Sequence, residues 1–426
     1  MATRHPLKYL LILFFLQPCI SGLQAQDDPY RFMFAPDVWY NNVDGVRLGV
    51  RTLGEVEGTF KDGPHRLDAG VWLSTFLPDL PVSYYVSFTE PIPQISNFGN
   101  EGSIQLISSI RTGYSHHRIQ FNKRWQPGFD EYKYKEVSVY YSTERLFDDE
   151  YRPFNKLWQD NWKNLFGISF KMSETLDFGL FEAYADATTN VNETSGAFTV
   201  ATFEVLQSIE LSDQFIWRIR GFAGIGSDNV APEYRFMASM RPAQYWLNNG
   251  LSRSAGTIPQ PWMESGSFQI AGGANLRGYS NRDIELLGTL QQSDNNLYFP
   301  LYRSFWSLNT EIEFPNPLNT ALQNISIIGD LAELRSYLFV DGGMGTGRTL
   351  MTGTQNVAPQ ELITEPGFIA DAGIGLQISF NIPDYLGKDR GIFIRYDVPF
   401  WLSDPLPREN SFSYRHVIGL GAVISL

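Results

Sequence analysis

The sequence predicts an all-β chain that folds as a transmembrane antiparallel β-barrel of about 16 strands. First, segments of roughly ten residues alternate apolar and polar side chains throughout the chain, with Gly, Pro, Asn and Asp between them. Second, the chain ends within such a segment, which suits a last strand that must close against the first. Third, aromatic residues make up 15% of the chain and cluster at strand ends, as in "VSYYVSF" and "VPFWL".

The N-terminus predicts export. Arg4 and Lys8 precede an apolar run from Tyr9 to Leu16, which is too short to cross a bilayer as a helix. This pattern is typical of a secretory signal peptide, and we expect cleavage after Ala25. The expected organisation is a signal peptide, a short periplasmic segment and an outer-membrane barrel, at residues 1–25, 26–43 and 44–426.

Cys19 is the one cysteine of the chain and would leave with the signal peptide. The mature protein would then have neither disulfides nor a thiolate metal site. A lipid-modified Cys19 is the alternative, but Gln17 and Pro18 stand where small residues would be expected.

Four segments show the alternation most clearly, at residues 45–53, 66–76, 391–400 and 416–426. In the first, Val46 and Val50 share one face while Arg47 and Arg51 share the other. A soluble sandwich or propeller would turn the apolar faces into a core, whereas a membrane barrel turns them to lipid. Glycines on the polar faces favour the barrel, and the lack of a repeating block argues against a propeller.

One segment has a helical pattern. In "FNKLWQDNWKNLFG", residues 154–167, the side chains of Leu157, Trp158, Trp162 and Leu165 share a face at helical spacing. We expect a short helix in a surface loop.

Motifs for chemistry are weak. "GGMGTGRT", residues 342–349, has the glycine spacing of a phosphate loop, but Arg348 replaces the lysine and no helical pattern follows. His116 and His117 would point to opposite faces of a strand, so they cannot share a metal. The chain has neither H-E-x-x-H nor G-x-S-x-G. We expect neither an enzyme nor a cofactor.

Two further patterns argue against particular ligands. The acidic stretches "LFDDEY" and "QQSDNN" offer calcium ligands but are more typical of solvated loop tips, so no metal site is predicted. A net charge of −13 argues against nucleic acid as a partner.

The stretch "GGANLRGY", residues 272–279, resembles the arginine-glycine-aromatic loop motif of the BamA-like superfamily of outer-membrane assembly and translocation barrels, the bacterial surface antigen type. In that family the motif lies on a long extracellular loop that folds back into the barrel lumen. Further segments resemble the strands that follow in the family and the first barrel strand. These are residues 309–318, 337–345, 371–380, 392–400 and 417–426, and residues 40–50 for the first strand.

The resemblance implies that Arg277 ties the loop to the inner wall through Asp341 and either Glu311 or Glu313. Alternation agrees, because these carboxylates face inward if the apolar faces meet lipid. A guanidinium would bind such carboxylates in a planar, bidentate manner.

The residues after the arginine also carry expectations. We expect Gly278 to supply either a positive φ or a close backbone approach to the wall. Tyr279 is expected to pack on inner glycines, at positions 343, 373 and 375.

By this resemblance, the protein would act in the insertion, assembly or translocation of other proteins or lipids at the outer membrane of a Gram-negative bacterium. Its first and last strands, near residues 44–54 and 416–426, would form a weak seam. Residues 26–43 leave no room for a periplasmic domain of the family's size, so a separate periplasmic or outer-membrane protein partner would deliver clients, and outer-membrane lipids would surround the wall. The alternatives are a passive channel or structural barrel, and the membrane module of an exported enzyme complex.

Overall fold

The computed structural model describes residues 30–424 with gaps. The gaps are residues 42–43, 57–64, 77–80, 112, 129, 131, 148–157, 193–195, 213, 248–264, 281–298, 326–330, 352–359, 362–366, 384–388 and 406–408.

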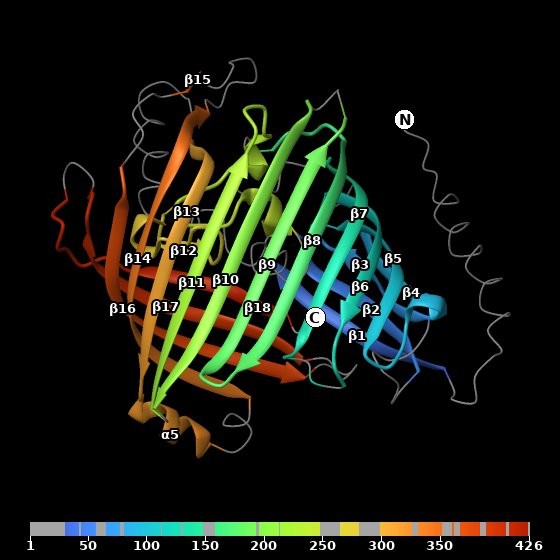
Figure 1. Ribbon diagram of the computed structural model, residues 1–426, viewed down its shortest axis with the longest axis horizontal. Coiled ribbons are helices and arrows are strands. Elements are labelled where there is room, and N and C mark those ends of the chain that lie inside the picture. The colour runs from blue at the N-terminus through green and yellow to red at the C-terminus, as the bar shows by residue number, and fades with distance from the viewer. Residues whose placement is uncertain are drawn as a thin grey trace.

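The described residues form one 18-stranded sheet that curves into a barrel (Figure 1). Two of these strands, β12 (Phe268–Ile270) and β15 (Gln360–Glu361), have only three and two residues. The other 16 make the wall, and each pairs antiparallel with the next along the chain. The predicted all-β fold with about 16 strands is therefore confirmed. The wall strands are β1 (Arg31–Asn41), β2 (Gly45–Glu55), β3 (Arg66–Ser74), β4 (Val82–Pro91), β5 (Asn100–Arg111), β6 (Tyr114–Trp125), β7 (Tyr134–Leu146), β8 (Lys163–Leu176), β9 (Gly179–Asn190), β10 (Phe198–Ser212), β11 (Phe215–Gly226), β13 (Phe299–Phe314), β14 (Ala332–Met351), β16 (Ile369–Pro383), β17 (Asp389–Leu402) and β18 (Val417–Ile424).

Short helical segments connect the strands. The α-helix α5 (Pro317–Gln323) lies between β13 and β14, and Asn316 caps it by accepting a hydrogen bond from the backbone N–H of Leu318. The 3-10 turns are η2 (Pro93–Ile95), η5 (Pro232–Tyr234), η6 (Ala243–Leu247) and η7 (Arg277–Tyr279). Within the described residues, no helix is both long enough and apolar enough to cross a membrane.

The apolar side of each wall strand faces outward. On β14, Leu338 and Val340 are each 50% exposed, whereas Phe339 between them is 2% exposed and Tyr337 and Asp341 on either side are 0% exposed. Because successive side chains of a strand point to opposite faces, this alternation extends along the wall. The sequence left two directions open for the apolar faces, and the structure turns them outward, as in a barrel surrounded by lipid.

Glycines on the inner face make room for aromatic rings of the neighbouring strand. A Cβ at Gly373 would lie 2.5 Å from the ring of Phe339, and one at Gly375 would lie 2.3 Å from the ring of Tyr337. Both rings are buried and belong to β14, the strand that pairs with β16. Gly and aromatic residues thus fit together across the ladder, which keeps the inner wall closely packed.

The expected start of the barrel was wrong. Strand β1 occupies residues 31–41, inside the segment 26–43 that we expected to precede the barrel. It pairs with β2 along its whole length, and Phe34 and Val38 point outward with 71% and 63% of their surface exposed. Pro36 in its centre obscures the pattern, because proline cannot donate to a strand ladder and is found on edge strands.

The expected helix at residues 154–167 was also wrong in the part that the structure describes. Residues 158–162 have no helical structure, and β8 begins at Lys163; residues 154–157 lie outside the described chain. In β8, Leu165 faces inward with 2% exposure and Phe166 faces outward with 54%. The period-2 pattern of the wall overrides a helical spacing that only four residues supported.

The weak motifs fall where strand geometry explains them. Residues 342–349 lie within β14 and pair with β13, so they do not form a phosphate loop. His116 and His117 are neighbours on β6 and contact different groups, the ring of Tyr114 and the hydroxyl of Ser108. The stretch "QQSDNN" and most of "LFDDEY" lie outside the described residues.

We expect Gly375→Ala to destabilise the barrel. Its Cβ would meet Tyr337 at 2.3 Å and Asp397 at 2.4 Å, two buried side chains that are joined by a hydrogen bond of 2.7 Å. Such overpacking costs about 1 to 3 kcal/mol. The temperature at which the folded band disappears in gel electrophoresis should fall. Gly367→Ala is the control, because its Cβ would meet nothing within 4 Å; equal temperatures for both variants would contradict the prediction.

Candidate functional site: a loop fastened inside the barrel

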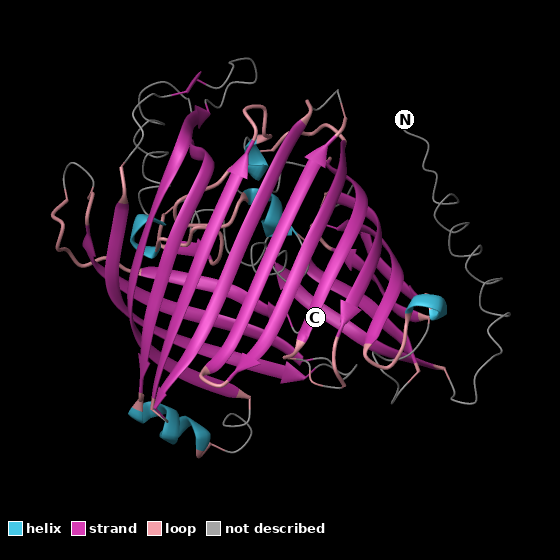
Figure 2. Ribbon diagram, viewed as in Figure 1, coloured by secondary structure: helices cyan, strands magenta, loops and turns pink. Residues whose placement is uncertain are grey.

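The connection between β11 and β13, residues 227–298, carries the arginine motif. The structure describes two parts of this loop, residues 227–247 and 265–280, and Figure 2 shows their helical turns among the strands of the barrel. The two parts bind each other: the backbone N–H of Leu276 donates to the carbonyl of Ala238 at 2.9 Å, and Arg241 donates to the carbonyl of Ala271 at 2.6 Å. They therefore form one folded unit, which we name the lumen loop.

Arg277 is fully buried, and two wall carboxylates bind its guanidinium. Nε and Nη2 donate to the two oxygens of Asp341 at 2.7 and 2.8 Å, and Nη1 donates to Glu311 at 2.7 Å. The ring of Phe339 lies 3.9 Å from the guanidinium carbon, close enough for a cation–π contact. The planar fork thus meets one bidentate partner and one single partner. We name these ion pairs the lock.

The lock holds a charged group where water is excluded. Burial alone would lower the pKa of Arg277, but the charges of Asp341 and Glu311 raise it well above its ordinary value. The guanidinium therefore stays charged, and each partner that is removed would leave an uncompensated buried charge.

Glu313 is not part of the lock. It accepts hydrogen bonds from Arg335 at 2.8 Å and from Arg218, while Arg335 also reaches Glu311 at 3.3 Å. Of the two glutamates that alternation placed on the inner face, the structure brings Glu311 to Arg277 and leaves Glu313 to other arginines. Arg335 connects the two carboxylates, so the lock continues into a wider network of charges.

Gly278 is required for close approach and not for a left-handed backbone. A Cβ there would lie 2.4 Å from Leu402 and 2.8 Å from Asp371, so a side chain would push the loop off the wall. The left-handed conformations come earlier, at Gly273 with φ 62° and Asn275 with φ 57°. Of the two roles that we expected for Gly278, a positive φ or a close approach to the wall, the structure shows the close approach.

Tyr279 is buried but does not pack on the expected glycines. Its hydroxyl donates to the carbonyl of Ala370 at 3.2 Å, lies 3.3 Å from the hydroxyl of Ser403, and accepts from the backbone N–H of Asp404. The expectation was wrong because wall aromatics already fill the space over those glycines, at positions 343, 373 and 375. Tyr279 instead binds the ends of β16 and β17.

Three polar groups of the wall that sequence reasoning missed also bind the lumen loop. Arg220 donates to the carbonyl of Gly273 at 2.7 Å, Asn309 donates to the carbonyl of Asn275 at 3.2 Å, and Arg395 donates to the side-chain oxygen of Asn275 at 3.2 Å. All three occupy polar positions of alternating strands, so the pattern indicated that they face inward. It gave no information about which atoms of the loop they would meet.

The lumen loop is also held at a second place, which we name the second anchor. Glu233 forms an ion pair with Lys163 of β8, and both side chains are almost fully buried. Next to them, the hydroxyl of Tyr234 donates to Glu144 of β7, which also accepts from Tyr114 at 2.6 Å. Burial raises the pKa of Glu233, and the positive charge of Lys163 opposes that shift.

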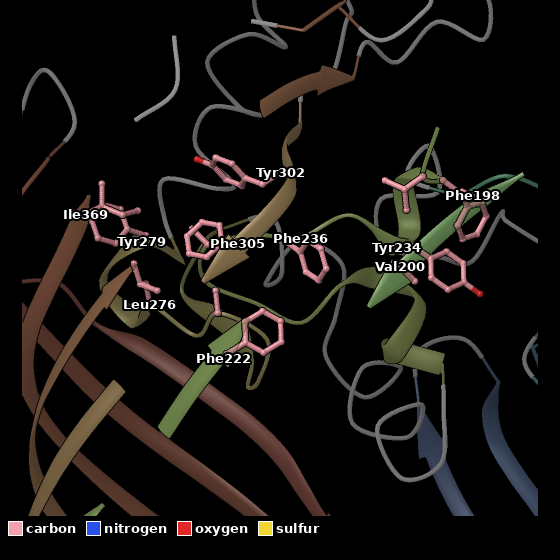
Figure 3. Packing of buried hydrophobic residues seen from close by; sticks show 14 of the residues in the cluster. Phe198, Val200, Phe222, Tyr234, Phe236, Leu276, Tyr279, Tyr302, Phe305 and Ile369 are labelled. Atoms are coloured by element: carbon pink, nitrogen blue, oxygen red, sulfur yellow. The ribbon is translucent and has the colours of Figure 1, made fainter. Parts of the chain in front are cut away.

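A buried apolar cluster joins the two attachment places. Figure 3 shows its aromatic members from loop and wall, and Tyr234 lies at one end while Tyr279 lies at the other. Between them, Phe236 of the loop pairs through its backbone with Tyr302 of β13, at 2.8 and 2.9 Å, and its ring fills the space over Gly224 of β11. The loop is therefore packed against the wall by apolar contacts as well as by ions.

We expect Arg277→Ala to release the lumen loop. Removing one partner of a buried ion pair costs about 3 to 5 kcal/mol, because Asp341 would remain buried without its cation. The variant should unfold at a lower temperature and be cut faster by protease added to intact cells. Arg277→Lys should be impaired too, since a single ammonium cannot reproduce the bidentate contact.

The control for both variants is Arg303→Ala. Arg303 pairs with Asp228, but these side chains are 36% and 78% exposed, so little stability should be lost. If Arg277→Ala matched Arg303→Ala in protease sensitivity and thermal unfolding, the lock would not hold the loop.

The second anchor predicts a non-additive result. Lys163→Met or Glu233→Leu alone leaves a buried charge without its partner and should destabilise the protein by about 3 to 5 kcal/mol. The double variant removes both charges and should recover much of that loss. Thermal unfolding of the three variants tests this, and additive losses would show that the pair does not act as a unit.

Comparisons with known proteins do not assign this chain to a family. No protein-family model matches the chain, and no curated protein matches it by sequence. Solved structures that resemble it include BamA from Haemophilus ducreyi lacking POTRA domains 1–3 (12% identity, TM-score 0.44, 92% of this chain and 71% of that one) and CdiB from Escherichia coli (8% identity, TM-score 0.46, 93% and 68%). CdiB from Acinetobacter baumannii is similar at 12% identity with a TM-score of 0.37, over 93% of this chain and 60% of that one. At such values the likeness adds nothing to what the strand pairing establishes, an antiparallel barrel with a loop bound to its inner wall.

Proposed function

We propose that the protein is an outer-membrane barrel that takes part in the insertion, assembly or translocation of other proteins or lipids. The observation that carries this proposal is the seam: among the described residues, β1 pairs residue by residue with β2 alone, and β18 pairs with β17 and β12 but not with β1. In a barrel that serves only as a closed wall, we would expect the first and last strands to pair, because closure removes both unpaired edges.

The physical chemistry of lipid supports the proposal. In a bilayer each backbone N–H and C=O needs a partner within the protein, so an unpaired strand edge is costly. Pro36 at the centre of β1 withholds one donor from any ladder, which weakens closure at this place in particular. The seam is thus the part of the wall that separates most easily, and a strand or an acyl chain of a client can enter there.

The lumen loop supports the same proposal by keeping the rest of the barrel in shape. The lock binds it to β13 and β14, and the second anchor binds it to β7 and β8. With these walls held from inside, separation is confined to the seam. Clients would reach the seam from a separate protein partner, and the outward apolar wall would contact outer-membrane lipids. The proposed activity requires neither a cofactor nor a catalytic residue.

A structural barrel or a passive channel is the second candidate. The observation that favours it is the same doubly attached loop, because a loop held at two walls also suits a barrel that is simply stable or whose conductance is restricted. The two candidates differ in what happens to other membrane components when the protein is removed.

The deciding measurement is quantitative proteomics of outer membranes with and without the protein. We expect selective depletion of a group of barrels or surface lipoproteins, restored by the wild-type gene and by Arg303→Ala but not by Arg277→Ala. An unchanged outer-membrane proteome would reject the assembly role. If purified barrels in planar bilayers then conducted more after Arg277→Ala, the channel would be the better description.

A further inference from the structure

The edge of β18 that faces the seam is partly occupied by a segment of the lumen loop. Strand β12 pairs with β18 in parallel, with Phe268 opposite Ile418 and Ile270 opposite Leu420. The backbone N–H of Ile418 donates to the carbonyl of Ser267 at 2.7 Å. One edge of a strand can carry one ladder, so β12 and β1 cannot occupy these positions of β18 at the same time.

The side chains of β12 hold it in this place. Gln269 is fully buried, and its amide donates to the carbonyl of Ser239 while its oxygen accepts from Arg395 of β17. Ile270 is 1% exposed. The strand is short, however, and parallel pairing is slightly weaker per residue than antiparallel pairing.

The position of β12 is linked to the lock through shared partners. Arg395 binds both Gln269 and Asn275, and Asn275 precedes Arg277 by two residues. The amide of Gln269 also lies 3.5 Å from the side-chain oxygen of Asn275. A movement of β12 away from β18 would therefore disturb the segment that carries the lock.

We infer that β12 is a removable cap on β18. It pairs with three of the eight residues of β18 while the seam is open, and it must leave before the 11-residue strand β1 can close against these positions. The seam exchanges between a capped state, with β12 on β18, and a closed state, with β1 on β18. This inference deepens the proposed function and rests on it for its purpose: the exchange regulates when the seam is open to clients.

Disulfide trapping in native membranes tests the exchange. Cys19 is replaced by serine, and Phe268→Cys is combined with Ile418→Cys, which face each other across the ladder. Oxidation should link this pair and shift its mobility in gels. The control combines Phe268→Cys with Ile374→Cys, an outward position on β16. Because β12 pairs with β18, β18 with β17 and β17 with β16, the two strands are three strand spacings apart, about 14 Å, so no link should form.

A second set of variants follows the closed state. Cysteines at successive positions of β1 are paired one at a time with Ile418→Cys, with and without Gln269→Ala. Loss of the buried amide should shift the ratio of linked species from β12 toward β1 by about tenfold, the effect of one buried hydrogen bond. The inference is overturned if positions 268 and 418 do not link in membranes, or if links from β1 do not respond to Gln269→Ala.

The regulatory part has its own test. In cells, the oxidised pair of positions 268 and 418 should fail to restore the outer-membrane proteome, and reduction should restore it. Full restoration by the oxidised protein would overturn regulation by the cap. If removing the protein leaves the proteome unchanged from the start, the proposed function fails, while the trapping experiment still decides whether β12 and β1 exchange.

Discussion

The burial of the Arg277 guanidinium, away from water, is the constraint on which much of this structure depends. Arg277 can be buried only where carboxylates meet it, and Asp341 and Glu311 do so from two neighbouring strands. Those carboxylates face inward only in one register of β13 and β14, since a slip of one residue would turn them toward lipid. The lock therefore forms only when β13 and β14 are in this register. Once formed, it holds the lumen loop against these two strands.

Three kinds of interaction hold the lumen loop against the wall. Ion pairs fix two distant places, polar side chains of the wall bind the loop backbone, and an apolar cluster fills the space between them. The ion pairs fix where the loop lies but add little net stability, because the free energy lost when charges leave water offsets much of the attraction between them. The aromatic rings of the cluster supply the apolar burial, so attachment and stability come from different residues.

Alternation predicted the strands and which side chains share a face, and the family resemblance predicted Arg277 and its carboxylates. Strand β1 was missed because Pro36 interrupts its pattern. The second anchor could not be predicted, since Tyr234 and Glu144 are 90 residues apart and neither belongs to a motif. The role of β12 was equally hidden: three residues within a loop carry no periodic signal, and their pairing with β18 follows from the folded path of the loop.

Strand β14 is longer than a membrane crossing requires. Its 20 residues span about 66 Å, whereas 9–11 tilted residues cross the hydrocarbon layer. Its pairing with β16 ends at Gly343, and β14 continues to Met351 beside β13 and the short strand β15, so this extension rises beyond β16 in Figure 1. Because its backbone is paired on both sides near its end, the extension offers a rigid attachment point for an epitope tag or a fluorophore, through which the barrel can be followed in living cells.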